Sequence, residues 1–325
     1  MMRTVVIGGS GHIGTYLIPM LVDAGHEVVN VSRGQREAYL PHAAWKQVTQ
    51  VQADREAEDR DATFAQRIVN LKPAIVIDLI CFTESSAQQL VEALTGHVQH
   101  FLHCGTVWAQ GHSTVVPMTE DQPLHPFGEY GIRKAAIEGY LLQQARQHHF
   151  PATVLRPGHI VGPGYSPLNP AGHFNPQVFA RIGRGEMLTL PNLGLETVHH
   201  VHARDVAHAF MQSITHWSGS VGEAFNVVSP AAITLRGYAE AMYAWFGKTP
   251  SLAFLPWDTW RTTVSEEEAR ATWDHIAHSP NASIAKARRL IEYQPVYSSV
   301  QAVCEAVTWL LEHGKIAVDS QPVVS

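Results

Sequence analysis

The sequence Arg3-Thr4-Val5-Val6-Ile7-Gly8-Gly9-Ser10-Gly11-His12-Ile13-Gly14 joins a short apolar run to a glycine-rich turn, and a helical pattern follows it. Gly8 permits the tight turn, Gly11 lets the backbone approach a pyrophosphate, and Gly14 lets the helix pack closely on the strand. The unpaired N–H groups at the start of that helix favour an anion. Strand, turn and helix follow in the required order, so the stretch predicts a dinucleotide-binding site.

The rest of the chain continues the alternation of strands and helices. Short apolar runs separated by helical patterns favour a parallel sheet with crossover helices. The expected strands are 4–7, 27–31, 47–52, 74–79, 100–104 and 152–155. The expected helices are 13–24, 62–71, 85–94, 130–148, 234–246, 266–277 and 300–313. The predicted fold class is α/β, with a Rossmann-type doubly wound parallel sheet and a smaller, mostly helical C-terminal substrate domain.

A loop rich in proline and glycine at 165–176 predicts the point where the chain leaves the nucleotide domain. We expect residues 1–164 to form the NAD(P)-binding domain, with a return segment near 199–228. The substrate-binding cap is expected at 165–198 and 229–313, followed by a frayed tail at 314–325.

Composition restricts the class of protein. The chain has 325 residues, a formal net charge of −6 and three cysteines without metal spacing. The negative charge gives no basic surface for nucleic acid or an anionic membrane. No apolar run approaches the ~18 residues of a membrane helix, and the glycines at 8–14 interrupt any signal peptide. We therefore expect a cytoplasmic protein with a small-molecule substrate and no nucleic-acid or membrane partner.

Tyr130 and Lys134 stand four residues apart in the run 129–134, which places both side chains on one face of a helix. A phenol alone is a poor base because its unperturbed pKa is ~10, whereas a neighbouring ammonium favours the phenolate and lowers that pKa. The pair can exchange a proton with a substrate hydroxyl or ketone. Such pairs are common on amphipathic helices, and this one gains weight from the glycine-rich turn.

The glycine spacing together with Tyr130 and Lys134 resembles the extended short-chain dehydrogenase/reductase family, which includes NAD(P)-dependent sugar-nucleotide epimerases and dehydratases. Other segments follow the family's order along nearly the whole chain: 51–54, 76–81, 103–108, 156–164, 202–207, 225–227 and 283–289. The resemblance implies hydride transfer at a hydroxyl or keto carbon of a sugar nucleotide or related substrate. It also implies a homodimer in which helices 85–94 and 130–148 form a four-helix interface.

The resemblance implies a role for particular residues. Tyr130 is the acid/base, Lys134 lowers its pKa and binds the nicotinamide ribose, and Asp54 reaches the adenine. The implied cofactor contacts are Gly8, Ser10, Gly11, His12, Ile13, Gly14, Ser32, Arg33, Asp54, Leu79, Ile80, Cys104, Tyr130, Lys134 and Pro157. The implied substrate contacts are Cys81, Phe82, Thr106 and His159.

Ser32 ends the second expected strand, where relatives that use NAD carry an acid for the ribose 2′-OH. Arg33 follows, and a guanidinium suits a 2′-phosphate through its paired N–H donors. NADP(H) is therefore favoured over NAD(H). The alternative is that Arg33 is only a solvated loop cation.

The chain departs from the family pattern at three positions. Cys104 replaces the Ser or Thr that hydrogen-bonds the reacting oxygen, and a thiol is a weak donor. We assign that role to Thr106, with the reverse assignment left open. His159 replaces an Asn, and Val198 replaces an Arg that pairs with the substrate diphosphate, which weakens the case for a nucleotide sugar.

Three alternatives remain at this point. The hydride either returns to the same substrate, as in an epimerase or dehydratase, or leaves on the cofactor, as in an NADPH-dependent ketone reductase. A non-enzymatic, RNA-associated or regulatory relative with a decayed site is the third. The 20 histidines stand without the third and fourth ligands that zinc needs, so no metal site is expected.

Overall fold

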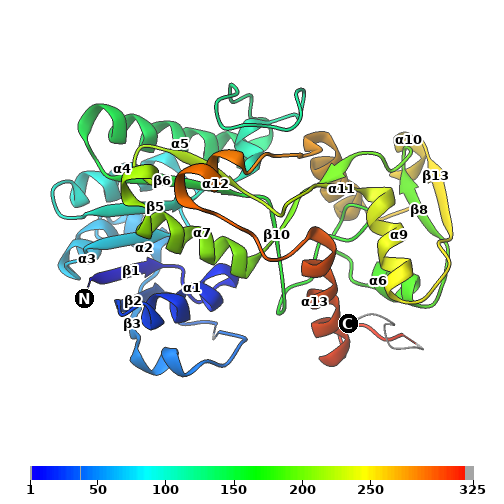
Figure 1. The fold of residues 1–325 in the computed structure, drawn as a ribbon, viewed down its shortest axis with the longest axis horizontal. Helices are drawn as coiled ribbons and strands as arrows, with labels where there is room; N and C mark the ends of the chain where they lie inside the picture. The colour runs from blue at the N-terminus through cyan, green and yellow to red at the C-terminus, as the bar shows by residue number, and fades with distance from the viewer. Residues whose placement is uncertain (1, 37, 319–325) are drawn as a thin grey trace.

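The computed structural model describes residues 2–36 and 38–318. Its ribbon forms two bodies, and the sheet lies in the larger one (Figure 1). The sheet has seven strands in the order β11-β6-β5-β4-β1-β2-β3, and every neighbouring pair is parallel. The strands are β1 (Arg3–Ile7), β2 (Glu27–Ser32), β3 (Thr49–Gln52), β4 (Ile75–Asp78), β5 (His100–Cys104), β6 (Ala152–Pro157) and β11 (Ala224–Val227). The predicted fold class is confirmed.

Helices cover both faces of the sheet, each over its own apolar cluster. One face packs against α1 (His12–Asp23), α7 (Ala203–Thr215) and α12 (Ala285–Ile291). The other packs against α3 (Phe64–Asn70), α4 (Glu84–Leu94) and α5 (Gly128–His148). Shorter elements of this body are η1 (Ala43–Gln47), α2 (Arg55–Arg60), η2 (Val107–Gln110) and α8 (Trp217–Ser220).

The smaller body has its own apolar core, to which Tyr238, Tyr243 and Trp260 contribute fully buried rings. Its helices are α6 (Gln177–Gly183), α9 (Leu235–Trp245), α10 (Trp257–Trp260), α11 (Glu266–His278) and α13 (Ser299–Glu312). Its strands β8 (Leu188–Pro191) and β13 (Leu252–Leu255) pair in parallel. Four further short strands form two pairs. β7 (His159–Val161) pairs with β10 (His200–His202), and β9 (Thr197–Val198) pairs with β12 (Ile233–Thr234).

Helix α11 has well-defined ends. Ser265 and Glu268 form a reciprocal capping box at its start, and Ser279 adopts a left-handed conformation at its end, with φ 43°. Both devices satisfy backbone groups that a helix otherwise leaves unpaired. The helix therefore begins and stops for local reasons encoded in its flanking residues.

The fold differs from expectation at three places. The helix expected at 62–71 is present as α3, and an additional helix, α2, precedes it, because Asp54 caps α2 and Ala62 turns to a left-handed φ of 53° between the two. The segment from Ala282 to Tyr293 joins the core of the nucleotide domain rather than the cap. Ile316 is buried against the cap, so the expected tail is packed as far as residue 318, and residues 319–325 lie outside the described part.

Within residues 2–36 and 38–318, no helix has both the length and the apolar character needed to cross a membrane.

Candidate active site

The turn between β1 and α1 has the geometry of a phosphate-binding turn. Gly8 has φ +86°, and its N–H donates to Val31 O at 2.8 Å. A Cβ on Gly14 would lie 1.9 Å from Gly9 O, so only glycine fits there. Gly11 is the N-cap of α1 and has no side chain to cap the helix. The first N–H groups of α1 are therefore available to an anion.

Neutral hydroxyl groups occupy the end of β2. Ser10 Oγ donates to Ser32 Oγ at 3.2 Å, and Asn30 Nδ2 donates to Ser10 Oγ at 2.9 Å. Arg33 is exposed beside them, and Arg36 Nη1 donates to Tyr165 Oη at 3.2 Å. Hydroxyls and guanidinium groups at this edge carry no negative charge that would repel a phosphate.

An aromatic cluster that sequence reasoning missed lies over the first turn of α1. His12 stacks on Tyr165 with ring centroids 4.2 Å apart, and Tyr39 Oη donates to His12 O at 3.4 Å. Burial lowers the pKa of His12 to about 3, so its ring is neutral at pH 7. Tyr39 and Tyr165 stand far apart in the sequence, and no spacing pattern connects them to the glycine-rich turn.

Lys134 is held at the carboxyl end of the sheet. Its Nζ donates to Cys81 O and to Cys104 O, each at 2.8 Å, and the side chain is 2% exposed. Tyr130, one turn earlier on α5, is 44% exposed, and its ring centroid lies 6.0 Å from Lys134 Nζ. The two residues therefore share a helix face as predicted, with Tyr130 lining the cleft and the Lys134 ammonium buried behind it.

The pKa of Tyr130 is not lowered in this structure, which differs from the sequence expectation. Desolvation by the surrounding walls raises the pKa of Tyr130 to about 12, and the neighbouring Cys104 acts in the same direction. A hydrogen bond with Thr106 acts in the opposite direction but is outweighed. Lys134 is instead directed to the two backbone carbonyls. Tyr130 is therefore a neutral phenol at pH 7.

Thr106 and Cys104 lie differently with respect to the open space beside Tyr130. Thr106 lines the same cleft as Tyr130, and its Oγ1 accepts a hydrogen bond from Trp108 N at 3.2 Å. Cys104 is 6% exposed within the apolar core, and burial raises the pKa of its thiol to about 11. Of the two candidates, Thr106 is the one that reaches the cleft.

The other predicted cofactor residues divide into two groups. Leu79 N donates to Ile7 O at 3.0 Å, and a Cβ on Gly8 would lie 2.6 Å from Ile80 Cγ2, so both residues adjoin the glycine-rich turn. Pro157 is buried at the end of β6. The Asp54 carboxylate, in contrast, accepts a hydrogen bond from Ala57 N at 3.1 Å as the N-cap of α2. Its position is thus explained by a helix cap.

The predicted substrate residues also divide. His159 lines the cleft with Tyr130. Phe82 is 51% exposed, and its ring centroid lies 4.9 Å from Lys134 Nζ. Cys81 is 1% exposed within the core beneath α4, and its Sγ contacts Thr83 O at 3.4 Å. The Cys81 side chain is therefore directed away from the cleft.

The cleft itself has a volume of about 1070 Å³ and lies between the two bodies. Sequence reasoning missed much of its cap-side wall, because those residues belong to no motif and come together only through the packing of α11. The nucleotide body contributes Thr106, Trp108, Tyr130, Gly158, His159 and Ile160. The remaining lining residues are Phe174, Val198, His199, Glu266, Glu267, Arg270, Ala271, Asp274, His275 and Pro280.

The histidines of the cleft are neutral. Burial lowers the pKa of His159 well below its usual value, and it lowers the pKa of His275 to about 4. His275 packs edge-on against Trp108 and against His159. Among the residues that the structure describes, no group of three or more His, Cys, Asp or Glu side chains is placed to hold a metal ion. The wall is therefore an aromatic surface with polar ring nitrogens.

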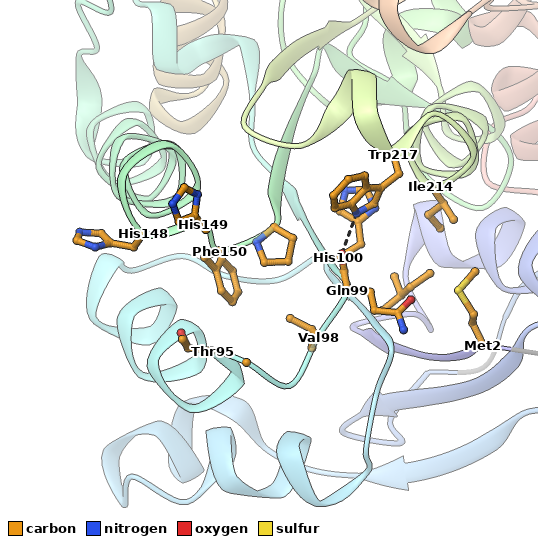
Figure 2. Close-up of a pocket in the computed structure, with 13 residues that line it drawn as sticks. Met2, Thr95, Val98, Gln99, His100, His148, His149, Phe150, Ile214 and Trp217 are labelled. Atoms are coloured by element: carbon orange, nitrogen blue, oxygen red, sulfur yellow. Dashed lines mark hydrogen bonds between the residues drawn. The ribbon is translucent and has the colours of Figure 1, made fainter.

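A second pocket, of about 640 Å³, opens at the opposite end of the sheet (Figure 2). Its lining includes His100 at the start of β5, Phe150 just before β6, and Trp217 at the start of α8. Open α/β sheets bind their ligands at the carboxyl ends of the strands, where the glycine-rich turn and Lys134 lie. This second pocket is therefore not the candidate active site.

Comparison with protein families gives a match over most of the chain. The model of the NAD dependent epimerase/dehydratase family matches residues 4–227. Among curated proteins, 2′-dehydrokanamycin reductase of Streptomyces kanamyceticus is 35% identical over 137 residues. The aligned part is 42% of this chain and spans only 37% of that reductase.

Two other similarities extend along nearly the whole chain. Chloroplast stem-loop binding protein of 41 kDa b from Arabidopsis thaliana is 22% identical over 322 residues, which cover 94% of this chain and 78% of that protein. The crystal structure of UDP-glucose 4-epimerase with UDP-glucose from Thermotoga maritima superposes with a TM-score of 0.73 and 20% identity, over 96% of this chain and 99% of that one. At that identity the superposition supports the fold alone.

Proposed function

Because this chain belongs to the NAD dependent epimerase/dehydratase family, as the match over residues 4–227 shows, we propose that it transfers hydride at a hydroxyl or keto carbon of a carbohydrate-type substrate. The predicted membership in the extended short-chain dehydrogenase/reductase group is confirmed. The observation that carries the proposal is the placement of Tyr130 and Thr106 on one cleft, with the Lys134 ammonium buried behind Tyr130.

The residues around the glycine-rich turn fit a dinucleotide. The absence of a Cβ at Gly14 lets α1 pack closely on the turn, and the uncapped first turn of α1 leaves N–H donors for a pyrophosphate. When bound, the nicotinamide accepts or supplies the hydride. Ser32 and Arg33 favour NADP(H) over NAD(H), because they offer a hydroxyl and a cation where an acid would bind the ribose of NAD.

Tyr130 handles the proton at the substrate oxygen. With a pKa raised to about 12, the phenol is protonated at neutral pH and is ready to donate to a carbonyl oxygen. The Thr106 hydroxyl holds that oxygen in place, and Lys134 binds the nicotinamide ribose while it fixes α5 to the ends of β4 and β5. A protonated phenol is the form that the reduction of a carbonyl needs, in a reductase and in an epimerase alike.

Two outcomes for the hydride remain within the family. A reductase releases the oxidised cofactor, as the name of the Streptomyces kanamyceticus relative describes, whereas an epimerase or dehydratase returns the hydride to its substrate. Val198 in the cleft wall supports a substrate without a diphosphate, because it stands at the position where the relatives carry an arginine that pairs with that group.

The test combines binding and turnover. Calorimetric titration with NADPH and NADH measures cofactor choice, and a screen of keto-sugars, nucleotide sugars and small ketones at 340 nm measures hydride transfer. We expect NADPH to bind more tightly and at least one keto-sugar to oxidise it. Failure to bind either cofactor would overturn the proposal.

The Arabidopsis thaliana relative supports a second candidate function, the binding of a structured RNA. The net charge of −6 opposes it, since phosphate backbones are bound by basic surfaces. A filter-binding titration with an RNA stem-loop at 50 and 200 mM salt decides the matter, because a genuine RNA interface gives a Kd that rises steeply with salt.

We also expect a homodimer, formed by the outer faces of α4 and α5. Ile132 on α5 is 53% exposed at that face. A C2 interface would bring two copies of each helix together. Light scattering at micromolar concentration measures the mass, and a monomer would contradict this expectation.

A further inference from the structure

The active-site cleft continues onto the outer surface of α11. A second, open depression of about 500 Å³ is lined by Trp257, Arg261, Val264, Glu266, Ala269, Arg270 and Trp273. Glu266 and Arg270 also line the cleft that holds Tyr130. Because the two hollows share these walls, they adjoin each other along α11, and a ligand longer than one ring can contact both.

Two tryptophans, Trp257 and Trp273, line the depression, and a third, Trp260, continues the row into the core of the smaller body. Trp260 is 1% exposed, and its Nε1 donates to Thr189 O at 2.9 Å. Trp257 stacks on Trp260 with centroids 5.7 Å apart, and Trp273 lies 5.3 Å from Trp257. Trp273 is 49% exposed. The row is therefore anchored at its buried end and presents an indole at its open end.

An exposed indole beside a cleft is a typical feature of a binding surface. The face of an indole is apolar and electron-rich, so it packs against the C–H face of a sugar ring, and it attracts cations. Trp273 is exposed to that kind of contact, while its neighbours keep the side chain in place. The depression therefore has the chemistry of a subsite for a second ring.

The charges around the two hollows select against phosphate. Of the side chains that line the cleft, all of them within the described residues, Glu266, Glu267 and Asp274 are carboxylates and Arg270 is the single guanidinium. In the depression, Arg261 is paired with Asp258 at 3.3 Å, which lies just outside it. A nucleoside diphosphate would meet like charges here, whereas an amine would meet opposite ones.

We propose that the depression is a second ring-binding subsite, and that the substrate is a glycoside of two or more rings that carries amino groups and no phosphate. The reacting ring lies against Tyr130, a distal ring lies on Trp273, and its amino groups face Glu266 and Glu267. This assignment of substrate class rests on the proposed function of the cleft, whereas the subsite itself is defined by its own lining residues.

The test compares four probes by calorimetry on the full chain: glucosamine, its β-1,4-linked trimer, the N-acetylated trimer, and UDP-glucose. The amine trimer is expected to bind at least about tenfold more tightly than the monomer, because only the trimer reaches Trp273. UDP-glucose is expected to bind more weakly than the amine trimer. Equal affinities for monomer and trimer, or tighter binding of UDP-glucose, would overturn the proposal.

Variants assign the effect to particular side chains. Trp273→Ala is expected to lower the affinity for the trimer about tenfold and to leave the monomer unchanged. Trp217→Ala is the matched control, because Trp217 is also 49% exposed but lies in the pocket at the opposite end of the sheet (Figure 2). An equal loss in both variants, or none in Trp273→Ala, would contradict the subsite.

A charge variant gives an independent readout. Glu266→Gln, at the exposed start of α11, is expected to weaken the amine trimer about threefold and to leave the N-acetylated trimer unchanged. Equal effects on the two trimers would contradict the assigned amine contact. NADPH titration of the same protein separates the two proposals, since loss of cofactor binding refutes the proposed function and leaves the trimer comparison valid.

Discussion

The two walls of the active-site cleft are built on different principles. On the nucleotide side the constraints come from the backbone: Gly14 has no room for a Cβ, and Lys134 binds the carbonyl groups of residues 81 and 104. On the cap side the wall consists of side chains on the surface of α11, such as Arg270 and His275, which the backbone would tolerate in other forms. The residues of the first wall are restricted by the cofactor that we propose it binds. The side chains of the second wall can vary with the substrate.

The largest expected effect removes the proton donor of the fixed wall. Tyr130→Phe is expected to lower kcat by about 10²–10⁴-fold, because the phenol is the only proposed proton donor. The ring still packs against Trp108, so NADPH affinity should change little. Steady-state kinetics and calorimetry measure the two quantities. A variant that keeps wild-type turnover would remove Tyr130 from the mechanism.

Acid should weaken the histidine-rich wall. Burial lowers the pKa of His199 and that of His275, which both line the cleft, to about 4, whereas both titrate near ~6.5 in the unfolded chain. Their contribution to stability is therefore complete above pH 6.5 and is lost as the pH falls toward 4, at up to about 1.4 kcal/mol per pH unit for each histidine.

Urea unfolding between pH 7.5 and 4.5 measures this slope. His275→Phe should reduce the slope, and the exposed His97→Phe should not change it. A free energy of unfolding that does not vary with pH over this range would mean that these rings are not buried as described.

Substitutions of Thr106 and of Cys104 test which of the two residues orients the reacting oxygen. Thr106→Val is expected to lower kcat/KM by about 10–100-fold, since it removes a hydroxyl that faces the cleft. Cys104→Ser places an oxygen in the core and should cost less. Kinetics of both variants in parallel decide the assignment, which is reversed if Cys104→Ser proves the more damaging change.

The smallest expected effect concerns cofactor choice. Arg33→Ala should weaken NADPH about tenfold and leave NADH unchanged, because an exposed guanidinium contributes one charge-assisted contact to a 2′-phosphate. Lys46→Ala, at an exposed lysine in η1, serves as a control cation. Loss of affinity for both cofactors alike would assign Arg33 to general attraction rather than to selection.

The difference between the walls also explains what could be predicted from sequence. The sheet, the glycine-rich turn and the α5 helix follow local rules, so all three appear at or near the expected residues. Contacts such as that between Tyr39 and His12 join distant segments, and no periodicity reports them. The raised pKa of Tyr130 was hidden for the same reason, since the walls that desolvate it come from segments far apart in the sequence.

The return of Ala282–Tyr293 to the nucleotide domain was equally hidden. Its apolar residues would suit either core, and only the packing of α12 against α7 and β11 decides between them. The cap-side lining of the cleft was hidden in the same way. The sequence predicted the helix α11, but not which of its side chains would line the cleft.

Helix α11 suggests how such a protein can acquire new specificity. Its ends are set by Ser265, Glu268 and Ser279, while one of its faces supplies Glu266, Arg270 and Asp274 to the cleft. A gene segment of 13 codons could therefore be randomised at its cleft-facing positions without altering the helix boundaries or the redox machinery. Directed evolution for a different acceptor sugar would begin there.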